Sequence, residues 1–212
     1  MARYVRPSYN ITDVFAAACA AHRVNGGYIK YEEHDDEGNI VKTPNKYVIR
    51  EFLMGSGVVV DEDRDLAEKV MQYCRSLTFK LLSDKRLSDF ESTMLTIVEK
   101  ETTDSNLDIA VVSSLPASYE RSIVRKEQDV RLRESSGCIN AAVDTKVELD
   151  IEVVRCNYSN EWGVYYVTAI TENGVVFFAR SNSIDLGSKI RIKGKVKRHK
   201  EDRTQLSHVK II

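Results

Sequence analysis

Lysine and arginine residues alternate with apolar ones in the stretch from Ser188 to Lys200, which reads SKIRIKGKVKRHK. The cations occupy every second position from Lys189 to Lys197, separated by isoleucine, glycine and valine. Because successive side chains of a β-strand point to opposite faces, this spacing predicts a strand with one cationic and one apolar face. Such a cationic face has two uses. It can bind phosphate groups, or it can neutralise acidic side chains on a neighbouring strand.

Neutralisation of acids on a neighbouring strand is the interpretation that we favour over phosphate binding for the first three cations. A second alternating segment begins at Val147 and carries its acids at every other position. If the two strands pair antiparallel, Glu148, Asp150 and Glu152 face Lys189, Arg191 and Lys193, and each opposite-charge pair contributes about 0.2–1 kcal/mol. The acids do not extend further, so we predict phosphate contact for the remaining cations, which are Lys195, Lys197, Arg198, Lys200 and Arg203.

Aromatic residues are the second requirement for binding single-stranded nucleic acid, because each base stacks on an aromatic ring for about 1–3 kcal/mol. They cluster in and before two further predicted strands, WGVYYVTAIT and VVFFARS. Strand alternation lets only one of Tyr165 and Tyr166, and one of Phe177 and Phe178, face outward, while the others fill the core. The predicted contacts in this region are Tyr158, Trp162, Tyr166, Phe178 and Arg180.

Other chemistry receives little support from the sequence. The acidic stretches HDDEGN and VDEDRD lack the ligand spacing of a calcium loop, and the four cysteines form no CxxC pair. The chain contains no P-loop, GxGxxG or HExxH motif and no recognisable Ser-His-Asp order. We therefore predict no catalytic residue, no metal site and no cofactor. An enzyme acting on nucleic acid would need carboxylates that converge only in the fold.

Charge and composition narrow the class of protein. The net charge of -1 averages a cationic end and a more acidic remainder: Ser188–Ile212 holds 9 Lys/Arg against 2 Asp/Glu. With 42% hydrophobic and 30% charged residues, the composition is that of a globular protein. The sequence shows neither a membrane-length apolar run nor the apolar core of a signal peptide. These features and the scattered cysteines predict a cytoplasmic location without a membrane segment.

Helical and strand patterns occupy different parts of the chain. Apolar residues recur at helical spacing in residues 61–83 and 86–101, after an Ala-rich helix and an exposed hairpin around HDDEGN. After the small-residue stretch SSGCINAAVDT the period changes to two, and five short strands follow. We predict an α+β protein with a mainly helical domain over residues 1–134, a linker over 135–145 and a five-stranded barrel over 146–212.

The C-terminal part resembles a known family. The pair Trp162-Gly163, the strand VVFFARS and the ending KIRIKGKVKRHK followed by TQLSHVKII are similar to the oligonucleotide/oligosaccharide-binding (OB) fold. The likeness is nearest to the OB modules that end small phage and bacterial nucleic-acid-binding proteins. It implies binding on the second and third strands, bordered by the loops at 157–161 and about 199–203. Residues 1–142 resemble no family.

Together these features predict a protein that binds single-stranded nucleic acid, with DNA as the expected ligand, in phage or bacterial replication, recombination or repair. If the chain is phage-encoded, it is a viral protein of the host cytoplasm. Replication or recombination proteins and a second copy of the chain are compatible partners. The alternative is an adaptor or inhibitor that binds a host or replisome protein through its helical domain and its barrel.

Overall fold

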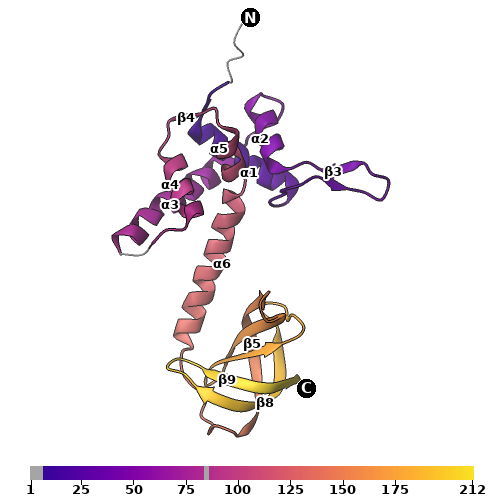
Figure 1. Ribbon diagram of the computed structural model, residues 1–212, viewed down its shortest axis with the longest axis vertical. Coiled ribbons are helices and arrows are strands. Elements are labelled where there is room, and N and C mark those ends of the chain that lie inside the picture. Colours follow the sequence, from indigo (N-terminus) through magenta and orange to yellow (C-terminus); the bar gives the residue numbers. More distant parts are fainter. Residues whose placement is uncertain (1–6, 84–85) are drawn as a thin grey trace, which may run out of the picture. The chain divides into compact units, whose positions relative to one another are not determined.

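The computed structural model divides the chain into two compact units, Met1–Ser122 and Ile123–Ile212 (Figure 1). It describes residues 7–83 and 86–212. The first unit is mainly helical and the second holds a closed β-barrel, which confirms the predicted α+β class. The long helix α6 (Leu115–Glu134) runs through the division, and the predicted domain limits at 134 and 146 stay a prediction.

In the described part of the helical unit, five helices and two short strand pairs precede α6. The helices are α1 (Ile11–Asn25), α2 (Asn45–Leu53), α3 (Asp61–Leu82), α4 (Asp89–Val98) and α5 (Asn106–Val112). Strand β1 (Tyr9–Asn10) pairs with β4 (Thr102–Thr103). Strand β2 (Glu33–His34) pairs with β3 (Ile40–Lys42), which confirms the predicted hairpin. Among the described residues, no helix is long and apolar enough to cross a membrane.

Helix α1 forms the centre of this unit because its alanines and larger apolar residues are buried almost continuously. The Asn10 side chain accepts a hydrogen bond from the Thr12 amide at its start, and Gly26 ends the helix with φ 65°. Phe15 and Cys19 are both buried, and desolvation raises the pKa of the Cys19 thiol to about 12. A thiol in this environment stays protonated and packs as a small apolar group.

Asp63 connects helix α3 to α1 through a buried carboxylate. Arg23 donates to both carboxylate oxygens, at 2.9 and 2.8 Å, and the Val60 amide donates to one of them at 3.0 Å. Burial by itself raises the pKa of Asp63, but these hydrogen bonds outweigh it and hold the net pKa below its usual value. The charged form therefore stabilises the fold above the unfolded-state pKa of about 3.9, and this contribution is lost as pH falls through the folded-state pKa.

We expect Asp63→Asn to lower the free energy of unfolding of the helical unit by about 1–3 kcal/mol at pH 7, because it weakens charge-assisted hydrogen bonds. The difference from the unmodified protein should shrink in strongly acidic buffer. Denaturant titrations at pH 7 and in acid measure both effects. Asp65→Asn is the control, since Asp65 is exposed on the same helix. Equal losses in the two variants would contradict the assignment.

The second unit contains the barrel. Its strands are β5 (Lys146–Ser159), β6 (Val164–Thr171), β7 (Gly174–Arg180), β8 (Lys189–His199) and β9 (Thr204–Ile211). Neighbouring strands follow the order β5-β6-β7-β9-β8 and close back onto β5. All pairs are antiparallel except β7 with β9. This closed five-stranded barrel is consistent with the OB-like barrel expected from the sequence.

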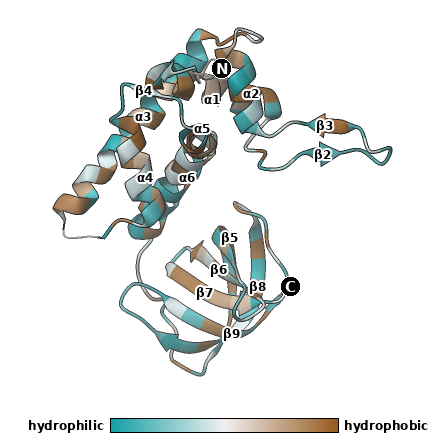
Figure 2. Ribbon diagram, turned by 45° about the horizontal axis from the view of Figure 1, so that its top comes forward, coloured by the Kyte–Doolittle hydropathy of each residue, from teal (hydrophilic) through white to brown (hydrophobic). Residues whose placement is uncertain are grey.

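Alternate residues of each barrel strand fill the interior, and Figure 2 shows hydrophobic and hydrophilic segments alternating along these strands. The buried cluster includes Val153 of β5, Val167 of β6, Phe178 of β7, Ile192 of β8 and Leu206 of β9. Ile139 belongs to the same cluster although it precedes the first strand. The barrel core therefore includes part of the segment between α6 and β5.

Backbone contacts fasten this segment to the barrel. The Gly137 amide donates to the Asp202 carbonyl at 2.9 Å, and the Ile139 amide donates to the Thr204 hydroxyl at 3.1 Å. His199 donates from Nε2 to the Ala141 carbonyl at 2.8 Å. Gly174 adopts φ 143°, and a Cβ there would meet the Gly137 carbonyl oxygen at 2.5 Å, so glycine permits the close approach.

Candidate nucleic-acid interface

The register between β5 and β8 explains the first half of the cationic strand. Glu148 lies opposite Lys193, Asp150 opposite Arg191, and Glu152 opposite Lys189, which confirms the predicted pairing. Lys193 Nζ lies 2.8 Å from a Glu148 carboxylate oxygen, and its hydrogen bond and charge hold the pKa of Glu148 below its usual value. Neutralisation between strands accounts for Arg191 and Lys193, which both pair with Glu148, whereas Glu152 pairs with Arg131 of α6.

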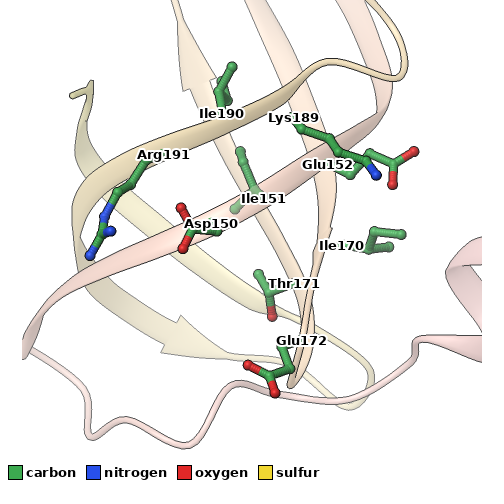
Figure 3. Close-up of a pocket in the computed structure, with 9 residues that line it drawn as sticks. All are labelled: Asp150, Ile151, Glu152, Ile170, Thr171, Glu172, Lys189, Ile190 and Arg191. Atoms are coloured by element: carbon green, nitrogen blue, oxygen red, sulfur yellow. The ribbon is translucent and has the colours of Figure 1, made fainter.

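An open pocket of about 410 Å³ lies along this paired region (Figure 3). Lys189 and Glu152 lie side by side in it, as their register requires. Carboxylates and cations both line the pocket: Asp150, Glu152, Glu172, Lys189 and Arg191. Because the two signs of charge are mixed, this pocket does not offer phosphate groups a cationic surface.

The second half of β8 departs from simple alternation. Lys195 Nζ pairs with Asp144 at 2.7 Å, an acidic partner that the sequence analysis did not anticipate. Val196 then pairs with Leu206 and Arg198 with Gln205, so Lys197 is the extra residue of a β-bulge. The bulge brings Arg198 beside Gln205 on the outer face, and Arg198 Nε donates to the Gln205 side chain at 2.7 Å.

One row of residues crosses the outer face of the barrel. The strand register places Arg155 of β5 opposite Thr168 of β6, and Thr168 opposite Phe177 of β7. Phe177 in turn lies opposite Gln205 of β9, and Gln205 opposite Arg198 of β8. Directly opposite residues share a face of a sheet. We call these five residues the outer row: an aromatic ring at the centre, polar side chains beside it and an arginine at each end.

The predicted contact at Phe178 is wrong, because its side chain is 2% exposed and belongs to the barrel core. Strand β7 aligns Phe178 with the buried Val167, which turns the neighbouring Phe177 outward. Phe177 is partly exposed, and Lys200 Nζ lies 4.9 Å from the centroid of its ring. Tyr166 is exposed, as predicted, and lies on the same face two residues before Thr168.

Tyr158 and Arg180 lie on the opposite side of the sheet. Tyr158 is opposite Tyr165, and Tyr165 is opposite Arg180, so the three continue the inward-facing series at one end of the barrel. The ring centroids of Tyr158 and Tyr165 are 4.9 Å apart. Trp162 is 66% exposed in the turn between β5 and β6, where Gly163 adopts φ 61°. The predicted aromatic contacts are therefore divided between two surfaces.

The loop between β8 and β9 holds Lys200 near the outer row. Lys200 donates its amide to the Arg203 carbonyl at 2.8 Å, and the Cys138 thiol donates to the Lys200 carbonyl at 2.8 Å. The Arg203 side chain pairs with Asp202, and this hydrogen bond keeps the pKa of Asp202 below its usual range. Among the described residues, Lys197, Arg198 and Lys200 have no acidic partner within 4.0 Å.

The group of cations and aromatic residues on the outer face is thus smaller than the set of contacts predicted from the sequence. It also includes two residues that were not in that set. Arg198 belongs to the outer row, Lys200 lies over its central ring, and Tyr166 is exposed on the same face. Lys197 is the exposed bulge residue beside Arg198, while Lys195 and Arg203 have acidic partners. Phe177 and Arg155 are additional candidates that the sequence did not single out, and Arg155 is included for its place in the outer row although it pairs with Asp129. Alternation marks Phe177 as one of two choices, whereas the outward position of Arg155 follows a bulge at Val154 that only the strand register shows.

Comparisons of the chain with protein-family models, curated proteins and solved structures found no match. The function of the barrel must therefore be inferred from its own geometry.

Proposed function

We propose that the chain binds single-stranded DNA on the outer row of its barrel. The observation that carries this proposal is Phe177, a partly exposed ring with Lys200 above it and an arginine at each end of its row. Surfaces that bind single strands combine aromatic rings, on which bases stack, with cations that follow the phosphates. The strand order of the barrel and the OB resemblance of its sequence support the same function.

In this arrangement bases stack on Phe177 and Tyr166. Phosphates contact Lys197, Arg198 and Lys200, three cations of β8 and its following loop for which the described residues supply no acidic partner. Thr168 and Gln205 offer polar groups between these contacts without favouring one base. Binding releases counterions from the strand and therefore weakens as salt rises. Replication, recombination or repair in a phage or a bacterium is the setting that we propose for such an activity.

Neutralising the cations tests the proposal. We expect Arg198→Gln or Lys200→Gln to weaken binding of a labelled single-stranded DNA and to reduce the slope of log K against log salt by about 0.7 for each lost phosphate contact. Fluorescence anisotropy at several salt concentrations measures both quantities, and a single-stranded RNA of the same sequence tests ligand preference. Lys193→Gln is the control, because Lys193 pairs with Glu148. A control that weakens binding as strongly, or an unmodified protein that fails to bind at low salt, would overturn the proposal.

A protein partner is the second candidate function. Tyr158, Trp162 and Arg180 are of the residue types that dominate binding energy at protein interfaces. In the helical unit Phe79 and Leu82 of α3 are 71% and 76% exposed. An adaptor of replication or recombination proteins would use such surfaces, and it would show little affinity for oligonucleotides at any salt concentration.

A further inference from the structure

Arg155, at one end of the outer row, is held by helix α6. The portion of α6 from Ile123 onward belongs to the same compact unit as the barrel. Arg155 Nη2 donates to a carboxylate oxygen of Asp129 at 2.5 Å, and Arg155 Nε donates to the Gln128 side chain at 3.1 Å. The opposite end of the row differs: in the part of the chain that the structure describes, the Arg198 side chain donates only to the neutral Gln205 side chain.

The contact between this part of α6 and the barrel is polar. A second ion pair joins Arg131 to Glu152 of β5 at 2.6 Å. The apolar side chains Val124 and Val130 of the same helix segment are 46% and 50% exposed, so they are not buried against the strands. Partly exposed ion pairs contribute little net stability, and salt or a competing anion exchanges with them readily.

We propose that Asp129 occupies a phosphate site of the interface. In the free protein its carboxylate holds Arg155, and a bound single strand replaces this carboxylate with a phosphate group. Arg155 is then a DNA-binding residue, and the end of α6 is a competitor that the strand must displace. This inference rests on the proposed function of the outer row.

The chemistry of the two anions supports the exchange. Carboxylate and phosphate oxygens both accept the parallel hydrogen bonds that a guanidinium group donates. The hydrogen bond from Arg155 lowers the pKa of Asp129, so the carboxylate is charged at neutral pH and acts as an anion in this position. The register places Arg155 opposite Thr168, which is itself opposite Phe177, so a strand whose bases stack on Phe177 carries its backbone toward this guanidinium.

Removing the competitor should strengthen binding. We expect Asp129→Asn to bind single-stranded DNA about two- to fivefold more tightly, which corresponds to the loss of a partly exposed ion pair. The salt slope should change little, because Arg155 contacts a phosphate group in both proteins. Glu127→Gln is the matched control: it removes one negative charge from an exposed position on the same helix. Arg155→Gln should weaken binding, and in that background Asp129→Asn should have no further effect.

The outcomes separate this inference from the proposed function. If the unmodified protein binds DNA but Asp129→Asn behaves like Glu127→Gln, the exchange is wrong and the outer row stands. The exchange is also wrong if Asp129→Asn still tightens binding when Arg155 is replaced. If neither the unmodified protein nor any variant binds at low salt, the proposed function itself fails.

Hydrogen exchange gives an independent measurement on the unmodified protein. Saturating single-stranded DNA should reduce the protection of amides in residues 125–134, because the strand displaces the contacts that fasten this helix end to β5. Unchanged or increased protection there, with DNA bound to the barrel, would overturn the inference.

Discussion

Replacing Phe177 with alanine is expected to weaken binding of single-stranded DNA by about 1–3 kcal/mol, because it removes the ring at the centre of the outer row. This corresponds to a loss of about 5- to 150-fold in affinity. The salt slope should change little, since stacking releases few counterions and the cations around the ring remain. Anisotropy titrations at two salt concentrations measure the affinity and the slope together.

Phe177→Tyr serves as the control for this experiment, because it keeps an aromatic face and should retain most of the affinity. The assignment is contradicted if alanine binds as tightly as phenylalanine. It is also contradicted if tyrosine is as damaging as alanine, which would indicate a steric role in place of stacking.

The neighbouring residue should behave differently. Phe178→Ala is expected to lower the free energy of unfolding of the barrel unit by about 3–5 kcal/mol, the usual loss for a large side chain deleted from a core. Its ring is 2% exposed and packs in the cluster that includes Val167 and Ile192. Denaturant unfolding followed by circular dichroism measures the loss.

Phe177→Ala is the matched comparison for stability, since it deletes the same side chain one residue earlier on the outer face. We expect it to cost much less stability than Phe178→Ala. Similar stability losses in the two variants would mean that the alternation of β7 does not separate the core from the interface in solution.

Local patterns in the sequence were sufficient to predict the main helices and the barrel strands. Helical spacing predicted α3 and α4, and Ser88 caps α4 as a capping box with Glu91. Alternation predicted the barrel strands, and the matched spacing of acids and cations predicted the register of β5 with β8. Each of these features depends on residues close together in the chain, or on a whole face of like residues.

The features that the sequence did not predict depend on contacts between residues far apart in the chain. The choice between Phe177 and Phe178 depends on the register of β7 against β6, since both residues fit either face equally well. The bulges at Val154 and Lys197 each add one residue to a strand, and their positions follow from pairing with β6 and β9. The Asp144 partner of Lys195 precedes the strand pattern, so alternation carried no sign of it.

The segment before β5 has a consequence for how this module can be separated from the rest of the chain. Gly137, Cys138 and Ile139 fasten the β8–β9 loop and fill part of the barrel core. A fragment cut at Lys146, where the strands begin, would lose these supports and with them the position of Lys200. The smallest fragment that keeps the interface intact therefore begins no later than Gly137, before the first strand of the barrel.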